Sequence, residues 1–215
     1  MTRSIPESAG YDQPMTTRVP TITQCLAYMD DFAMLDNIRL HSLMVAHAAA
    51  ALLAGLARAE KTKAPLPASD LVVAGALLHD IAKTQCLHGA CKHALVGQEI
   101  CRDLGFPEIG EIVREHVILS DYAPERYRQG LFNAKELVYY ADKRVRHDMI
   151  VSLDSRLEYI LGRYGDNDPM KESFIITNFR ICQEFEHLLF SFLDVPPSDL
   201  AQITTARSFS LPLSE

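Results

Sequence analysis

The sequence predicts an all-α fold in a single compact helical domain. Apolar residues recur at intervals of three and four along most of the chain, which is the spacing of one helix face. Leu71, Gly75, Leu78 and Ala82 follow one another in this way. No stretch of convincing length alternates apolar and polar residues, and no segment is repeated. With 215 residues, of which 48% are hydrophobic, the chain is long enough to bury one full core.

Composition divides the chain into a helical domain and two tails. Residues 1–20 are polar and rich in proline, so we expect a tail or a loosely packed arm. The helical domain is expected from residue 21 to residue 195. The chain is polar after two consecutive prolines, and residues 196–215 are therefore predicted to form a second tail.

The individual helices are predicted from their apolar stripes and from residues that favour helix ends. Ser69 suits the position before a helix, and Gly105 and Pro107 suit a helix end and the next helix start. The last helix has an apolar seam typical of a core or of a homodimer face. In chain order, helices are expected from Thr21, from Ile38 to Ala59, from Ser69 to Asp80, from Cys91 to Leu104, from Pro107 to His116, from Asn133, from Val151 to Tyr164 and across Phe174 to Phe192.

Charge and cysteine content limit the function and the compartment. The formal net charge of −7 argues against binding to long nucleic acid, which needs many contacts from Lys and Arg to phosphate. It allows a small phosphate ester if metal and local cations reverse the field in a cleft. The five cysteines contain no CxxC pair, which favours free thiols in the cytoplasm, and Cys86 and Cys91 are expected to be buried or incidental thiols. No stretch approaches the ~18 apolar residues of a membrane span, and we expect no membrane partner.

His79 and Asp80 stand out because they follow a run of small and apolar residues. Helical spacing puts His79 on the inward stripe, and Asp80 lies about 100° further around the helix. Burying an unpaired carboxylate is costly, so buried charges are normally paired or bound to metal. A divalent cation is the simplest common partner, although a core histidine paired with its neighbour is the more ordinary interpretation of this dipeptide alone.

Four further residues repeat this pattern elsewhere in the chain. His41, His93, His116 and Asp142 each lie on or beside an apolar helical stripe. Most inward histidines are simply hydrogen-bonded in a core, and His47 is expected to be a packed or half-buried histidine. Six inward imidazole and carboxylate residues near helix ends, however, favour a metal site. A mixture of imidazole and carboxylate suits a divalent transition metal (iron, manganese, zinc, nickel or cobalt) better than calcium.

The order His41, His79-Asp80, Asp142 resembles the H…HD…D signature of the HD-domain metal-dependent phosphohydrolases. The neighbouring residues are also similar, in Leu77-Leu78-His79-Asp80-Ile81-Ala82-Lys83 and in Tyr140-Ala141-Asp142-Lys143. The resemblance covers roughly residues 35–165. It implies an all-helical core in which the four signature residues bind a first metal ion. In the dinuclear branches, Asp80 would bridge to a second ion bound by His93 and His116, and we expect one or two ions.

The resemblance also implies an activity and a set of substrate contacts. The expected reaction is hydrolysis of a nucleotide or other small phosphate ester by a metal-activated hydroxide, with monoester and diester substrates both open. Asp80 and Lys83 are the candidate catalytic residues. Lys83 is the first candidate for a phosphate contact, followed by Lys143 and Arg146, and His88 could reach a substrate phosphate from its loop.

Two other functions remain open at this point. A minority of HD-fold proteins resemble dinuclear iron oxygenases, which would show redox-active iron and oxygen consumption. A non-catalytic nucleotide-binding regulatory protein could keep the same scaffold. The complete set of candidate ligands argues against this second alternative, because a degenerate member should have lost one of His79, Asp80 or Asp142.

Overall fold

The computed structural model describes residues 18–62, 64–87 and 91–205, and within these ranges the fold is all-α, as predicted. The candidate residue His88 and most of the predicted N-terminal tail lie outside the described residues. The elements are α1 (Ile22–Asp31), α2 (Asp36–Arg58), α3 (Ser69–Leu78), α4 (His93–Asp103), α5 (Pro107–Glu115), α6 (Pro124–Tyr127), α7 (Ala134–Arg144), β1 (Val145–Arg146), β2 (Met149–Ile150), α8 (Leu153–Tyr164), α9 (Pro169–Phe190), the 3-10 turn η1 (Pro197–Asp199) and α10 (Leu200–Thr205).

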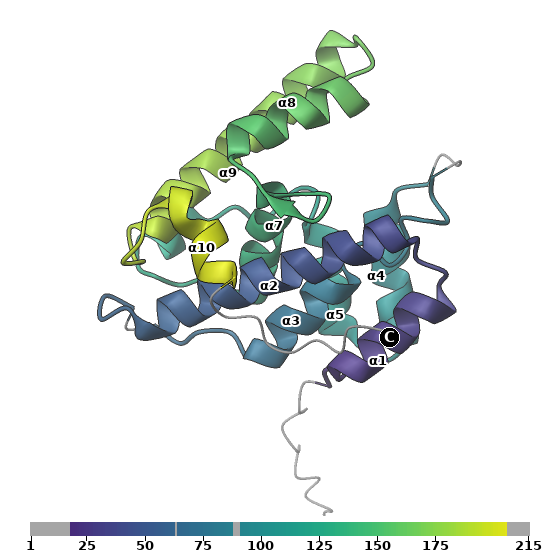
Figure 1. The fold of residues 1–215 in the computed structure, drawn as a ribbon, viewed down its shortest axis with the longest axis horizontal. Helices are drawn as coiled ribbons and strands as arrows, with labels where there is room; N and C mark the ends of the chain where they lie inside the picture. The colour runs from purple at the N-terminus through teal and green to yellow at the C-terminus, as the bar shows by residue number, and fades with distance from the viewer. Residues whose placement is uncertain (1–17, 63, 88–90, 206–215) are drawn as a thin grey trace, which may run out of the picture.

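Helix α2 is the centre of the molecule. It packs against α3, α7 and α10, while α3 also contacts α1, α5 and α7. Figure 1 shows α2 crossing the body above α3 and α5, with α8 and α9 projecting from the body as a pair. By length and composition α2 is apolar enough to cross a membrane, but 56% of its most apolar stretch is buried. A central core helix has the same composition, and this is the role that α2 has here.

Two glycines let three helices approach closely. A Cβ atom on Gly75 of α3 would lie 2.7 Å from Cδ1 of Ile112 in α5. A Cβ atom on Gly97 of α4 would lie 2.7 Å from Cγ1 of Val113, which is also in α5. Because only glycine leaves this space, α3 and α4 both pack tightly on α5. The end of α3, the start of α4 and the end of α5 are thereby held together.

Several element boundaries differ from the sequence prediction. Ala68, not Ser69, precedes α3, and Ser69 is already in the first helical turn. Residues 145–150 form a hairpin whose two strands have two residues each, which is too short to show a strand pattern in the sequence. The prediction that residues 196–215 form a tail is wrong for residues 197–205. Leu200 is fully buried there, and the Pro197 carbonyl accepts a hydrogen bond from a buried arginine.

Candidate metal centre

The structure brings six predicted residues together, and we call them the His–Asp cluster. His41 comes from α2 and Asp142 from the last turn of α7. Five of the six are buried, and only the His93 side chain is partly exposed, at 26%. The members from the tightly packed helices are His79 at the end of α3, Asp80 directly after it, His93 at the start of α4 and His116 at the end of α5.

One half of the cluster is built around His41 and His79. Ligand atoms of these two residues and of Asp80 all lie within 4.8 Å of one another. Asp142 Oδ1 lies 2.9 Å from His41 Nε2 and 3.7 Å from His79 Nε2. These four residues could hold one cation from three different segments of the chain.

The other half uses the second oxygen of the same aspartate. Asp80 Oδ1 lies 3.3 Å from His93 Nε2 and 3.4 Å from His116 Nε2, whereas Asp80 Oδ2 lies 3.4 Å from His79 Nε2. The Nε2 atoms of His93 and His116 are 3.1 Å apart. Asp80 is therefore shared by two groups of ligands, one on each side of its carboxylate.

Backbone carbonyls orient three of the four imidazoles. Nδ1 of His79 lies 2.7 Å from the Ala76 carbonyl, and Nδ1 of His116 lies 2.5 Å from the Val113 carbonyl. Both contacts join a residue that ends a helix to the carbonyl three positions earlier. His41 Nδ1 is 3.1 Å from a carbonyl in the β1–β2 turn. A carbonyl only accepts hydrogen bonds, so Nδ1 carries the proton and Nε2 faces the cluster, as in many metal-bound histidines.

The protonation states suit cation binding. Burial would raise the pKa of Asp80, but Lys83 and His79 outweigh this effect and hold the pKa well below its usual range. Burial likewise opposes ionisation of Asp142, yet Lys143 and His41 keep its pKa well below the ordinary value. Burial lowers the pKa of His116 to about 4. At neutral pH the cluster therefore contains two carboxylates and a neutral imidazole.

These states leave buried polar atoms without a partner. The lone pair of neutral His116 Nε2 faces Asp80 Oδ1, and no proton lies between them. Within the described residues, Asp80 Oδ1 and His79 Nε2 are buried with no hydrogen bond. An unsatisfied buried charge is costly, and a divalent cation bound by these atoms would satisfy all of them. The donor set therefore fits a transition metal.

The pKa of His79 is shifted in the opposite direction. Burial lowers it, but the charges of Asp80 and Asp142 outweigh burial and raise the pKa above its ordinary value. Because a proton on Nε2 and a cation would occupy the same lone pair, they compete for His79. Acid should therefore displace a bound metal.

Three cations surround the two carboxylates. Lys83 Nζ donates to Asp80 Oδ2 at 2.7 Å. Lys143 Nζ is buried and donates both to Asp142 Oδ2 and to the His116 carbonyl, each at 2.8 Å. Arg156 of α8 lies with Nη2 3.9 Å from Asp142 Oδ1. Lys143 thus connects one half of the cluster to the other.

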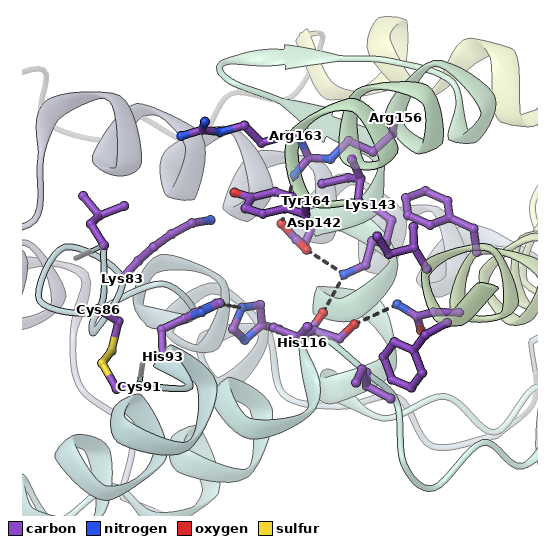
Figure 2. Close-up of a pocket in the computed structure, with 18 residues that line it drawn as sticks. Lys83, Cys86, Cys91, His93, His116, Asp142, Lys143, Arg156, Arg163 and Tyr164 are labelled. Atoms are coloured by element: carbon purple, nitrogen blue, oxygen red, sulfur yellow. Dashed lines mark hydrogen bonds and ion pairs between the residues drawn. A yellow bond between two sulfur atoms is a disulfide. The ribbon is translucent and has the colours of Figure 1, made fainter. Parts of the chain in front are cut away.

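The cluster opens into a cavity of about 390 Å³ between α5, α7, α8 and α9. Figure 2 shows Asp142 between two groups of residues that line this cavity, with His93 and His116 below it and Arg156, Arg163 and Tyr164 above it. A second cavity of about 140 Å³ reaches His41 and Asp80. The larger volume lies within the usual range for small-molecule sites.

Comparison with known proteins identifies the family. The model of the HD domain matches residues 39–152, which is more than half of the chain. This chain belongs to the HD-domain family. The resemblance to the metal-dependent phosphohydrolase superfamily, inferred from the signature residues, is thereby confirmed. HD domains bind divalent metals, and the His–Asp cluster is compatible with such an ion.

Two curated proteins are similar to this HD domain. An uncharacterized protein of Methanocaldococcus jannaschii is 33% identical over 136 residues, which are 59% of this chain and 79% of that protein. A tRNA (cytidine(56)-2'-O)-methyltransferase of Thermoplasma volcanium is 29% identical over 148 residues, covering 62% of this chain and 40% of that enzyme. No solved structure gives a significant match.

The substrate contacts predicted for this HD domain have different positions. Lys83 and Lys143 line the larger cavity. Arg146 lines neither of the two cavities, and its guanidinium packs over the Tyr159 ring at 4.6 Å. Its predicted role as a substrate contact is therefore not supported by its position. His47, expected to be a packed histidine, is half-buried on α2.

Arg156 is the cation that sequence reasoning missed. It lines both cavities and is buried, at 7% exposure. A signal was present in the sequence, because Arg156 lies between Leu153 and Ile160 on the inward stripe of α8. The same kind of signal, a charge within an apolar stripe, had identified Asp142.

The expectation that Cys86 and Cys91 are free thiols is wrong. The two residues form a disulfide, and their Cα atoms are 5.4 Å apart. Residue spacing alone does not show that these two cysteines approach one another. The disulfide lies beside the larger cavity (Figure 2), two residues before the cluster member His93.

Proposed function

We propose that this HD domain is a metal-dependent phosphohydrolase that cleaves a nucleotide or another small phosphate ester. One observation carries the proposal: Asp80 is shared by two ligand groups, and its Oδ1 atom and His79 Nε2 are buried without hydrogen-bond partners beside a cavity that several cations line. Imidazole and carboxylate ligands favour one or two ions of iron, manganese, zinc, nickel or cobalt.

Hydrolysis of a phosphate ester replaces one bond to phosphorus by another. The oxygen of water bonds to phosphorus, the bond to the ester oxygen breaks, and the departing alcohol takes up a proton. When bound, a divalent metal lowers the pKa of water and neutralises phosphoryl charge. The protein supplies the position of the substrate and further positive charge.

The residues of the chain have distinct roles in this proposal. Asp80 would hold ligand positions on both sides of its carboxylate. Lys83, whose side chain is 28% exposed, would contact the phosphate while it stays paired with Asp80. Burial opposes a charge on Lys83, but Asp80 and Asp142 outweigh this and raise its pKa, so Lys83 stays cationic. Lys143 would position Asp142, because its ammonium donates to the Asp142 carboxylate and to the His116 carbonyl, both in the cluster.

The proposed partners follow from charge and cavity size. A small phosphorylated substrate, of the nucleotide class, suits a cavity of about 390 Å³. The net charge of −7 disfavours long nucleic acid and anionic membranes. A homodimer through the exposed face of α9 remains a proposal from the sequence. We propose the cytoplasm as the compartment because three of the five cysteines are buried free thiols; the Cys86–Cys91 disulfide argues the other way, since stable disulfides are rare there. A thiol count on protein alkylated during cell lysis tests this proposal.

Metal content and phosphate release test the function. We expect one to two equivalents of transition metal by elemental analysis, together with phosphate release from members of a panel of nucleotides and simple phosphate esters. Asp80→Ala should lose both metal and turnover while retaining helicity by circular dichroism. Asp70→Ala, at an exposed position in the first turn of α3, is the matched control and should retain both.

The alternative functions predict other outcomes of the same experiment. Iron that is redox-active and consumes oxygen would favour the dinuclear oxygenase. Nucleotide binding without release of any product would favour the regulatory protein. Full turnover by the Asp80→Ala protein would show that the cluster is not the reactive site.

A further inference from the structure

The larger cavity has two chemically different walls. The wall that contains the His–Asp cluster is polar and carries the metal-ligating atoms. The opposite wall, built mainly by α8 and α9, carries most of the apolar residues, together with the cations Arg156 and Arg163. Its apolar residues, with those of the segment after α5, are Val117, Ile118, Ile160, Phe174, Ile175 and Phe179. A ligand that fills this cavity must therefore be amphiphilic.

Positive charge is in excess where the two walls meet. Lys83 and Lys143 are each paired with a carboxylate of the cluster. Arg163 makes no ion pair within the described part of the chain, and buried Arg156 has an Nε atom without a hydrogen-bond partner. The four cations at the cavity thus outnumber the two cluster carboxylates by two positive charges, which are carried by the two guanidinium groups. A bound metal adds to this excess. A phosphate monoester, with two negative charges, matches this environment better than a diester.

The apolar wall ends in aromatic side chains that are open to solvent. Phe174 lines the cavity although its side chain is 59% exposed, and Tyr164 lines it at 48% exposure. Single exposed apolar residues are common, but these two line the same cavity as the cations and the metal-ligating residues. An aromatic ring of a ligand could cover them and could stack on either.

We propose that the cavity binds a phosphate monoester whose alcohol part is aromatic or comparably flat and apolar. The phosphate lies toward the cluster, between Lys83 and Arg156, and the ring lies against Phe174 on the α8–α9 wall. Hydrolysis of this ligand rests on the proposed function, but its binding does not.

Binding of non-hydrolysable phosphonates tests the proposal without turnover. Titration calorimetry on the manganese-loaded protein compares phenylphosphonate with methylphosphonate, which share the charged group and differ in the ring. Covering the ring and Phe174 should make phenylphosphonate bind at least about tenfold more tightly. Phe174→Ala should reduce this ratio to about twofold or less. Arg156→Gln should weaken binding of both ligands and leave the ratio unchanged.

Met170 provides the matched control. It lies one turn before Phe174 on α9, is 82% exposed and does not line the cavity. Met170→Ala should therefore leave both affinities unchanged. Equal affinities of the two phosphonates for the wild-type protein, or a ratio that Phe174→Ala does not lower, would overturn the proposal.

Hydrolysis assays separate this inference from the proposed function. A protein that prefers phenylphosphonate but releases phosphate from no ester would retain the inference and refute the hydrolase. A protein that hydrolyses phenyl phosphate and glycerol phosphate with equal kcat/KM would retain the hydrolase and refute the inference.

Discussion

Replacing Gly75 by alanine should loosen the metal centre from a distance. The new Cβ atom would lie 2.7 Å from Cδ1 and 2.8 Å from Cγ2 of Ile112, and 3.3 Å from its Cβ atom. Rotation about the Cα–Cβ bond of Ile112 moves both methyl carbons, but it leaves the Ile112 Cβ atom 3.3 Å away and both branches must then find room in a packed core. Helices α3 and α5 must therefore move apart.

The expected cost follows from two opposing terms. Overpacking a core lowers the free energy of unfolding by about 1–3 kcal/mol, whereas replacing a helical glycine by alanine raises it by about 0.5–1 kcal/mol. The free energy of unfolding should therefore fall by roughly 0.5–2 kcal/mol, which lowers Tm by about 2–4 °C per kcal/mol for a chain of this size. His79 and His116 end the two helices that separate, so metal content should fall as well.

Thermal and urea unfolding, with elemental analysis of the purified variants, measure both effects. Gly162→Ala in α8 is the control, because nothing lies within 4 Å of its new Cβ atom. It should raise stability by about 0.5–1 kcal/mol and leave metal content unchanged. Gly75→Ala should also cost less in an Ile112→Ala background. A Gly75→Ala protein that is as stable as the wild type and keeps its metal would refute the argument.

Three further predictions concern other parts of the structure. Lys143→Met should cost about 3–5 kcal/mol in urea unfolding, because it leaves the buried Asp142 carboxylate without its cation, whereas exposed Lys171→Met should have no measurable effect. Burial raises the pKa of Glu136, so its protonated form favours the fold and this contribution is lost as pH rises from about 4.5. Relative to the wild type, Glu136→Gln should thus gain stability in urea unfolding between pH 4 and pH 7, while exposed Glu158→Gln should show no such trend. Reducing the disulfide that precedes α4 should lower metal content, measured after desalting, because the segment before His93 loses its restraint; unchanged content would contradict this.

The sequence predicted the cluster because two independent signals agreed. Helical periodicity showed which residues face inward, and a charged or imidazole side chain on such a face is costly unless it is paired. His116 and Asp142 were identified in this way before any distance was known. Their arrangement around a shared aspartate came from the family resemblance, because periodicity within one helix says nothing about which helices meet.

Other features depend on contacts that residue spacing does not encode. The position of Arg146 could not be derived, since β1 and β2 turn the chain directly after α7. The disulfide depends on the close approach of Cys86 and Cys91, whose Cα atoms are 5.4 Å apart. Helix α10 is only six residues long and becomes stable by burying Leu200, so its own pattern was too short to recognise.

The pair α8–α9 contributes none of the six cluster residues, although it forms much of the cavity wall. Hydrogen bonds join the middle and the C-terminal part of α9 to the rest of the domain. Arg144 donates to Glu186 at 2.8 Å, and Asn178 donates to the Val117 carbonyl at 2.9 Å. The exposed end beyond these bonds carries Phe174. On the proposed binding mode, mutations along that end would alter which molecules the domain selects and leave the His–Asp cluster intact, so selectivity and reactivity could evolve separately in this chain.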